Sequence, residues 1–354
     1  MSARNLVFRA GPGAFGSIRR HGFAPEQIGT LAGASGGAKW LILSQLDRVI
    51  LETLVPRLRG PVHLISSSIG AWRFSCYAQA NPVAAIERFE EAYIEQSYSE
   101  NPDTAEITAK SREILRTVLA DGAINEILEH PVFRTNIMTV RARHVTASGN
   151  RYLQGAALIA AASLNAISRR SLGLFFERAL FFDRRDKAPF HDVSGFSPQR
   201  VPIAADNYED AVVATGSIPL VLDGVRDIAG ARPGVYRDGG IIDYHLDLPQ
   251  SEPGKLAFYP HFIDRIVPGW FDKKLDWRRP AAAHVDRTVL ISPSADFIAA
   301  LPGGKIPDRT DFRRYSPAER IQVWRGVVAQ CEALAEELHE VIETDQLAAR
   351  LQPL

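Results

Sequence analysis

A serine stands at the centre of a short turn in the segment VHLISSSIGAWRFSCY, which covers residues 62–77. The apolar run Val62–Ile65 is short enough for one buried strand, and the residues after Gly70 could begin a helix. A strand, a sharp turn around a serine and a helix together form a nucleophile elbow, in which the serine hydroxyl projects at the end of a sheet. The dipole of the following helix favours negative charge that develops there. Ser68 is therefore a candidate nucleophile.

The elbow is usually spelled G-x-S-x-G, and Ser66 stands where the first glycine is expected. A serine-rich turn between a strand and a helix can also do no more than cap the helix. The local sequence leaves both interpretations open.

A glycine-rich turn precedes the serine turn in the chain. Gly36, Gly37, Ala38 and Lys39 follow the strand-like run Ile28–Ala32. Small residues let main-chain N–H groups face a substrate, which is what an oxyanion hole requires. The simpler explanation is a plain strand-to-helix turn.

An aspartate turn lies much later in the chain. Asp238 follows the strand-like Val235–Arg237 and is itself followed by Gly239 and Gly240. Glycines at these positions let the backbone approach another element closely. On its own, an Asp-Gly pair more often marks an Asx-type turn than a catalytic carboxylate.

The order of these motifs is more specific than any one of them. Gly36-Gly37-Ala38-Lys39, Ser68-Ile69-Gly70-Ala71, Ser217-Ile218-Pro219 and Asp238-Gly239-Gly240 follow one another in the chain. The set resembles the patatin-like phospholipase family, which carries a G-G-x-R/K loop, an elbow ending in S-I-G-A, an A-I-P segment and a D-G-G or D-G-A turn. The resemblance covers residues 28–249, most of the chain.

The resemblance implies a Ser-Asp dyad without histidine and without a cofactor, with Ser68 as nucleophile and Asp238 as base. It implies that the N–H groups of Gly36, Gly37 and Ala38 hold the oxyanion, and we expect Lys39 to orient that loop through hydrogen bonds. The implied activity is hydrolysis of lipid acyl esters or other small esters, of the phospholipase A or esterase type. An ordinary aspartate pKa of about 3.9 suits proton abstraction poorly. We therefore expect burial to raise the pKa, or the helix N-terminus and substrate binding to assist the serine.

Three departures from the family pattern leave another function open. Ser66 replaces the elbow glycine, Trp40 stands where the family usually has glycine, and a strand and a helix are expected before the first motif. A relative with an altered elbow could bind lipid or act as a scaffold without catalysis.

Ser35 is a rival nucleophile, because Gly33-Ala34-Ser35-Gly36-Gly37 is a complete G-x-S-x-G after a strand-like run. In that frame the oxyanion loop would be Gly11-Pro12-Gly13. The spacing favours Ser68, because the residues between Gly13 and Ser35 leave room for only a very short helix and a strand. Lys39 also supplies the basic residue expected beside an oxyanion loop.

A Ser-His-Asp esterase is a further alternative, because His245, His261 and His284 follow Asp238 in the order of an α/β-hydrolase triad. His245 comes directly after the aspartate turn and His284 ends an alanine run, so we favour packed or surface histidines. No His/Cys/Asp group shows the spacing of metal ligands, so we predict no metal site.

The composition limits the expected location and binding partners of the protein. Lys plus Arg and Asp plus Glu are 41 each, which gives no field that would favour nucleic acid. Cys76 and Cys331 are the only cysteines and the N-terminus lacks a long apolar run, so we expect a reducing, cytoplasmic location. Aromatic and basic residues alternate in the segment 268–279, which could contact a lipid surface peripherally; a solvated loop with packed tryptophans is the alternative.

The apolar runs predict an α/β fold, and the resemblance implies a three-layer sandwich with a mostly parallel central sheet. We expect residues 1–354 to form one domain with a helical insertion at about 81–130. A C-terminal amphipathic helix is predicted at about 317–351, where Ser316 and Glu319 could form a capping box. We expect this helix to close the core or to pair with a second copy of the chain in a homodimer.

Overall fold

The computed structural model describes residues 4–120 and 122–354, through which one sheet of 11 strands runs. The strand order is β11-β1-β10-β9-β2-β3-β4-β5-β6, with β7 and β8 attached beside β4. The strands are β1 (Leu6–Ala10), β2 (Ile28–Gly33), β3 (Val62–Ser67), β4 (Phe133–Ala142), β5 (Phe176–Phe182), β6 (Gln199–Pro202), β7 (Val225–Arg226), β8 (Val235–Asp238), β9 (Leu256–Pro260), β10 (Thr288–Pro293) and β11 (Leu351–Pro353).

The centre of the sheet is parallel. The neighbours β10, β9, β2, β3 and β4 all run in the same direction. Antiparallel pairs join β1 to β10, β5 and β8 to β4, and β7 to β8. Every residue of β3, β9 and β10 is buried, as expected for parallel strands with both faces covered. The predicted α/β class with a mostly parallel sheet is confirmed.

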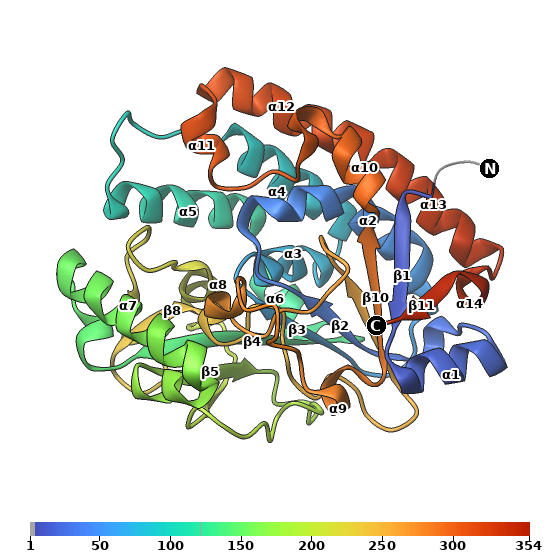
Figure 1. The fold of residues 1–354 in the computed structure, drawn as a ribbon, viewed down its shortest axis with the longest axis horizontal. Helices are drawn as coiled ribbons and strands as arrows, with labels where there is room; N and C mark the ends of the chain where they lie inside the picture. Colours follow the sequence, from blue (N-terminus) through green and yellow to red (C-terminus); the bar gives the residue numbers. More distant parts are fainter. Residues whose placement is uncertain (1–3, 121) are drawn as a thin grey trace.

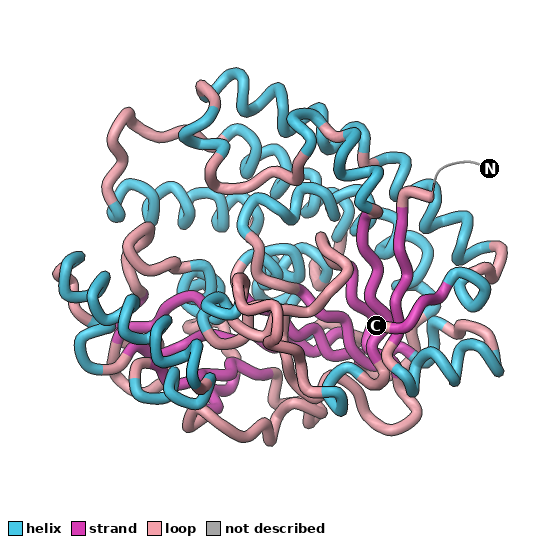
Figure 2. The backbone as a smooth tube through the Cα atoms, viewed as in Figure 1, coloured by secondary structure: helices cyan, strands magenta, loops and turns pink. Residues whose placement is uncertain are grey.

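Helices lie on both sides of this sheet (Figures 1 and 2). Helices α4, α5 and α12 lie above it in the view of Figure 1, and α7 lies below its left end. The α-helices are α1 (Pro12–His21), α2 (Ser44–Val49), α3 (Ile69–Tyr77), α4 (Pro82–Glu95), α5 (Thr104–Val118), α6 (Ala123–Glu129), α7 (Arg151–Ile167), α8 (Tyr208–Gly216), α9 (Ala282–Val285), α10 (Ala295–Ala300), α11 (Asp311–Arg314), α12 (Pro317–Gln330), α13 (Glu332–Glu343) and α14 (Leu347–Arg350).

The region expected to be a helical insertion, at about 81–130, contains α4, α5 and α6. Their apolar sides are buried in the main core, as at Phe89, Leu115 and Ile127. A second, smaller core lies under α7, where Leu158 and Ala161 pack with Val140 of β4 and Phe176 of β5.

The C-terminal stretch differs from the single helix predicted at about 317–351. The predicted capping box of Ser316 and Glu319 is present, but α12 ends at Gln330, α13 at Glu343, and α14 begins at Leu347. Asp345 adopts a left-handed φ of 52°, which no α-helix accommodates, and this ends α13. Trp324 and Leu334 are buried within the same chain, so the apolar stripe closes the core. The predicted homodimer stays a prediction.

None of the helices in the described part of the chain combines the length and apolar character needed to cross a bilayer.

Candidate active site

Strand β4 brings the two predicted turns together. Its first half pairs with β3, so that Ser67 lies opposite Met138. Its second half extends beyond β3 and pairs with β8, so that Asp238 lies opposite Thr139. Because β5 occupies the other edge of β4, β3 and β8 must share one edge. One strand is parallel to β4 and the other antiparallel, so their carboxyl ends meet there, 170 residues apart in the chain.

Ser68 has the backbone of a strained elbow. Its φ of 54° and ψ of −128° lie outside the regions that a residue with a side chain prefers. The Ser68 N–H donates to Oγ1 of Thr215 at 2.8 Å, and this hydroxyl donates to the carbonyl of Met138 at 2.5 Å. Thr215 therefore connects the elbow to β4 and holds the turn in its unfavourable conformation.

The structure brings the Ser68 hydroxyl into contact with the Asp238 carboxylate. Ser68 Oγ donates to Oδ2 of Asp238 at 3.0 Å, and the N–H of Gly240 donates to Oδ1 at 2.7 Å. The N–H of Asp238 donates to the carbonyl of Ser217, which places the Ser217-Ile218-Pro219 segment beside the turn. Burial raises the pKa of Asp238 to about 6, although both hydrogen bonds and the more distant Lys273 and Arg309 act to lower it.

Two glycines are required because backbones meet here. A Cβ on Gly70 would lie 2.1 Å from the carbonyl oxygen of Gly33, and one on Gly239 would lie 2.0 Å from that of Met138. Neither contact leaves room for a side chain. Gly70, the last glycine of the elbow, thus lets α3 pack against β2. Gly239, the first glycine of the aspartate turn, lets that turn pack against β4.

A buried ion pair links the elbow helix to the helix after the glycine-rich loop. Arg73 of α3 donates from two nitrogens to Asp47 of α2, and the hydroxyl of Tyr77 donates to the same carboxylate at 2.7 Å. Both charged side chains are almost fully buried. A bidentate pair in such a setting fixes orientation strongly, so the two loops keep their relative position.

The loop predicted to hold the oxyanion joins β2 to the short 3₁₀ helix η2 (Gly37–Leu43). Within residues 4–120 and 122–354, the N–H groups of Gly36, Gly37 and Ala38 donate no hydrogen bond. Gly37 has a φ of 57°, and a Cβ there would face open space. These are the features of donors left free for a ligand.

Lys39 does not orient this loop as expected. Its side chain forms no hydrogen bond in the described part of the chain, and its Nζ lies 4.9 Å from the centre of the Phe262 ring. Burial lowers its pKa, against the attraction of Asp308 and with smaller contributions from repulsion by Lys305 and Arg309. The loop is held instead by the N–H of Ser35, which donates to the carbonyl of Tyr244 at 3.0 Å.

The rival serine lies close by but has a different partner. The hydroxyl of Ser35 is 2.8 Å from that of Ser67, and both are buried. Ser66, which replaces the elbow glycine, is also buried and donates to the carbonyl of Asn136 at 3.2 Å. Its hydroxyl is thus accommodated inside the sheet and does not disturb the contact between Ser68 and Asp238.

The histidines of the alternative triad are occupied elsewhere. Nδ1 of His245 accepts from the N–H of Val267, and Nδ1 of His261 bonds to the backbone of Ile263. His284 contacts Asp247 at 2.8 Å. In the described part of the chain, no histidine forms a hydrogen bond with Ser68 or Asp238, so the structure gives the triad no support.

Two features of the site had little signal in the sequence. Thr215 lies two residues before the Ser217-Ile218-Pro219 segment, and its hydroxyl could have been noticed there. Lys273 and Arg309 belong to loops without a motif, and only the fold places them beside the aspartate turn.

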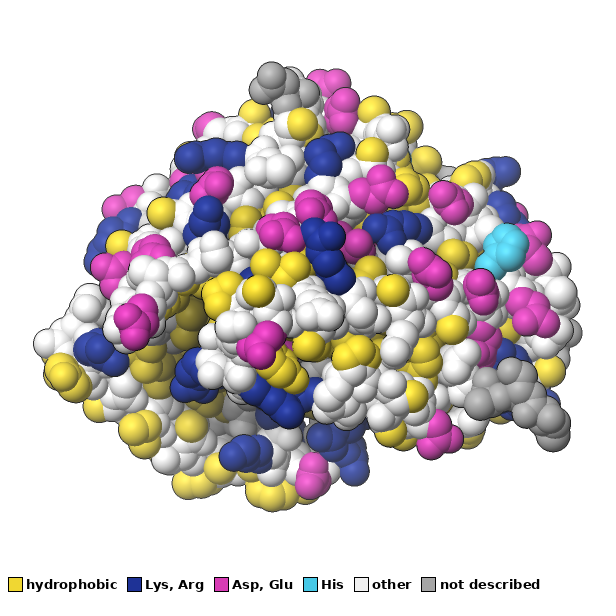
Figure 3. Space-filling view, turned by 90° about the horizontal axis from the view of Figure 1, so that it is seen from above, with side chains coloured by type: hydrophobic (Ala, Val, Ile, Leu, Met, Phe, Trp, Pro, Cys, Tyr) yellow, Lys and Arg dark blue, Asp and Glu magenta, His cyan; other side chains and the backbone are white. Residues whose placement is uncertain are grey.

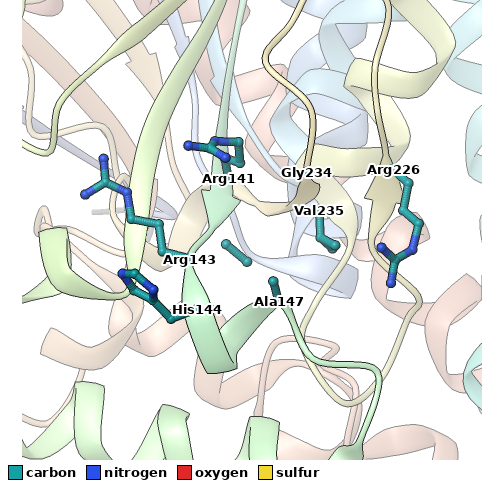
Figure 4. Close-up of a pocket in the computed structure, with 8 residues that line it drawn as sticks. Arg141, Arg143, His144, Ala147, Arg226, Gly234 and Val235 are labelled. Carbon is teal, nitrogen blue, oxygen red and sulfur yellow. The ribbon is translucent and has the colours of Figure 1, made fainter.

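A cavity lies away from the dyad. It has a volume of about 570 Å³ and contains Arg141, Arg143 and Arg226, at the opposite end of β8 from Asp238 (Figure 4). Arg141 already bonds the buried Glu177 at 2.6 Å, and Arg143 donates to the carbonyl of Gly173 at 2.7 Å. These two arginines therefore already have partners outside the cavity lining. Among the described residues, no group of three or more His, Cys, Asp or Glu could hold a metal ion.

No protein-family model matches the chain, and no curated protein matches it. Among solved structures it is similar to VipD from Legionella pneumophila, with 12% identity and a TM-score of 0.33 over 73% of this chain and 53% of that chain. The chain thus spans about half the length of that protein. A likeness this weak carries no argument about activity, which has to come from the site itself.

Proposed function

We propose that the chain is a serine hydrolase of carboxylic esters that uses Ser68 as nucleophile and Asp238 as base. The observation that carries the proposal is the 3.0 Å hydrogen bond between the two side chains in a strained strand-turn-helix elbow. The four motifs that resemble patatin-like phospholipases support lipid acyl esters as the substrates, in a phospholipase A or esterase reaction.

In the acylation step, Ser68 Oγ attacks the ester carbonyl carbon while its proton passes to Oδ2 of Asp238. The carbonyl oxygen becomes an oxyanion, which the N–H groups of Gly36, Gly37 and Ala38 stabilise. When the tetrahedral intermediate collapses, the bond to the leaving alcohol breaks and the alcohol takes the proton from Asp238. The acyl group remains on Ser68.

In the deacylation step, a water molecule attacks the acyl carbon and gives a proton to Asp238. The second intermediate collapses to the free carboxylic acid, and the proton returns to Oγ of Ser68. One carboxylate thus serves both steps as base and then as acid. Its raised pKa of about 6 suits both roles better than an ordinary aspartate would.

A fluorophosphonate probe tests this proposal directly, because it reacts with an activated serine and not with an ordinary one. We expect intact-mass and peptide analysis to find the probe on Ser68 in the wild type. Ser68→Ala should lose the label, and Ser35→Ala should keep it. An unlabelled wild type would favour the inactive lipid-binding or scaffolding relative. Label retained in Ser68→Ala but lost in Ser35→Ala would make Ser35 the nucleophile.

The substrate class needs a separate measurement. A panel of p-nitrophenyl esters and phospholipids should be hydrolysed by the wild type and not by Ser68→Ala. Release of fatty acid from phospholipid would establish the phospholipase reaction, whereas turnover restricted to soluble esters would make the protein an esterase.

A further inference from the structure

Three basic side chains from distant parts of the chain gather beside the dyad. Lys39 follows the glycine-rich loop, Lys273 follows the short helix η8 (Trp270–Asp272), and Arg309 precedes α11. Within residues 4–120 and 122–354, none of the three has a carboxylate oxygen within 4.0 Å. The nearby Lys305 contrasts with them, because it pairs with Asp308 at 3.0 Å and with Asp311 at 2.7 Å.

Aromatic rings hold these cations in place of carboxylates. Nζ of Lys273 lies 4.1 Å from the centre of the Tyr244 ring and 5.5 Å from that of Trp270. The guanidinium of Arg309 lies 6.0 Å from the same Trp270 ring. Contacts of this kind attract a cation without neutralising its charge. The positive charge of each protonated side chain therefore remains available to a ligand.

The backbone ties this group to the proposed catalytic residues. Tyr244, on which Lys273 rests, accepts a hydrogen bond from the N–H of Ser35 at the base of the glycine-rich loop. A Cβ on Gly269, next to Trp270, would lie 3.2 Å from the carbonyl oxygen of Ile241, just after the aspartate turn. The aromatic platform thus borders both the oxyanion loop and the turn that holds Asp238.

The three cations also repel one another. Desolvation, then repulsion from Lys39 and Arg309, lowers the pKa of Lys273 to about 7, with Asp238 acting in the opposite direction. Like charges gathered without a counter-ion are unfavourable, and a bound anion would relieve the repulsion. Asp308 is the acid that faces Lys39, but it is already paired with Lys305.

We propose that Lys39, Lys273 and Arg309 form a subsite for an anionic group of the substrate, a phosphate or a carboxylate close to the scissile ester. This inference rests on the proposed hydrolase function and makes it more specific. The oxyanion loop would hold the reacting carbonyl, while the three cations would hold a second, permanent negative charge. Neutral esters of the same size would lack that contact.

Two soluble esters with the same leaving group test the charge preference. Mono-p-nitrophenyl adipate carries a carboxylate on a chain too long for rapid ring closure onto its own ester, and p-nitrophenyl hexanoate is neutral and of similar length. We expect the wild type to have a higher kcat/KM for the anionic ester at low ionic strength, and salt to reduce this preference. In Lys273→Gln and in Arg309→Gln, the ratio of the two kcat/KM values should fall about tenfold.

Lys274→Gln is the matched control, because this neighbouring lysine is exposed and has no carboxylate partner in the described residues. Its ratio should equal that of the wild type. A short-chain phosphatidic acid compared with the matching diacylglycerol tests phosphate as the source of the charge. If the ratio of anionic to neutral kcat/KM falls in Lys273→Gln and Arg309→Gln for either anion, the result supports the subsite and identifies the anionic group that it prefers. Equal ratios in Lys273→Gln, Arg309→Gln and Lys274→Gln for both anions would overturn it.

A binding measurement tests the anion subsite independently of the proposed hydrolase activity. Calorimetric titration of Ser68→Ala with mono-p-nitrophenyl adipate measures the subsite in a protein that cannot be acylated at that residue. Binding that is lost in Ser68→Ala/Lys273→Gln supports the subsite even if the wild type hydrolyses nothing. Hydrolysis without any binding preference for the anion would retain the hydrolase and remove the subsite.

Discussion

Asp238 carries an ionisable carboxyl group in a place where its charge is unfavourable. The side chain is only 8% exposed, and burial raises its pKa to about 6 against the opposing effects of the Gly240 N–H and the Ser68 hydroxyl. A carboxylate with such a pKa accepts a proton more readily than an ordinary aspartate and is still mostly ionised at neutral pH. The same burial that suits the residue for catalysis should also make it costly for the fold.

The catalytic consequence is a pH dependence with a definite direction. The proposed base must be deprotonated, so kcat/KM should be low at pH 4.5, rise through about pH 6 and level off above it. A pH–rate profile with p-nitrophenyl butyrate measures this. A profile that is flat between pH 5 and pH 7 would be inconsistent with Asp238 as the base.

The stability consequence has the opposite direction. The pKa of Asp238 is higher in the folded chain than the ordinary 3.8, so the folded state binds more protons between those values and loses stability as the pH rises through them. At pH 8 the full cost is about 3 kcal/mol. Asp238→Asn should therefore abolish activity and raise the melting temperature at pH 8, with a much smaller gain at pH 4.

Thermal unfolding of both proteins at the two pH values measures the effect. Asp206→Asn is the control, because Asp206 is exposed and forms no ion pair in the described part of the chain. A change at Asp206 should leave the difference between the two pH values as it is in the wild type. Equal destabilisation of Asp238→Asn at both pH values would show that the lost hydrogen bonds outweigh the removed charge.

At the scale of elements, the turns around the dyad depend on close backbone contact. Gly70 of α3 contacts the backbone of β2, and a Cβ there would lie 2.1 Å from the carbonyl oxygen of Gly33. A backbone oxygen cannot move aside as a flexible side chain can, so the helix itself would have to shift. The elbow and the packing of α3 therefore share one requirement.

Gly70→Ala should accordingly lower stability by about 1–3 kcal/mol, in the range of overpacked cores, and reduce fluorophosphonate labelling of Ser68. Gly16→Ala is the matched control, because Gly16 lies in α1 and a Cβ there would meet nothing within 4 Å. That substitution should stabilise the protein by about 0.5–1 kcal/mol, since alanine favours a helix over glycine. Denaturant unfolding of both variants measures the difference. Equal stability of the two would show that α3 can shift without cost.

Elements could be predicted from the sequence where a local pattern defines them. The buried run of β3, the turn residues around Ser68 and Asp238, and the capping box at Ser316 all gave local signals. The breaks in the C-terminal helix gave none, because the apolar stripe continues past Cys331 and no Gly or Pro marks Asp345. The length of β4, which lets one edge receive both β3 and β8, is a property of pairing between distant segments.

The candidate site likewise contains residues that a local motif predicts and residues that no local pattern predicts. Motif order along the chain pointed to Ser68, Asp238 and the glycine-rich loop, because each is part of a turn with characteristic residues. Lys273 and Arg309 lie in irregular loops whose sequences set no distance to the dyad. Only the packing of Trp270 and Tyr244 brings them there.

At the scale of the whole molecule, charge and apolar surface are distributed differently. Acidic and basic side chains are intermixed over the face shown in Figure 3, and the chain has no net charge. Large exposed apolar side chains in the described residues are instead concentrated around α7: Val145, Tyr152, Leu153, Ile159, Leu164, Ile167, Leu174, Leu220 and Trp277. An apolar patch on one helix marks a contact surface.

This surface adjoins the proposed active site. Oε1 of Gln154 in α7 accepts from the N–H of Leu220, which follows the Ser217-Ile218-Pro219 segment. At the other end of α7, Nδ2 of Asn165 donates to Asp272 at 2.7 Å, one residue before Lys273. A hydrolase of lipid esters needs its substrate delivered from a bilayer, so we propose that α7 and Trp277 contact the membrane.

Arginines around the surface favour an anionic bilayer. Arg151 and Arg170 lie at the two ends of α7, Arg279 follows Trp277, and all three are exposed without a carboxylate partner in the described part of the chain. Apolar side chains would enter the interface while these cations meet lipid phosphates. Vesicle co-sedimentation should show binding that increases when phosphatidylglycerol is added to phosphatidylcholine.

Ile159→Ser/Ile167→Ser should weaken this binding at least about tenfold, because the two side chains are 70% and 83% exposed and would lose contact with lipid. Activity on soluble p-nitrophenyl butyrate reports whether the dyad is intact in the same variant. Ala329→Ser, an exposed site on α12 across the molecule from α7 (Figure 1), should bind vesicles as the wild type does. If the double variant still sediments like the wild type, the apolar face of α7 does not contact lipid, and the exposed isoleucines must serve a different partner.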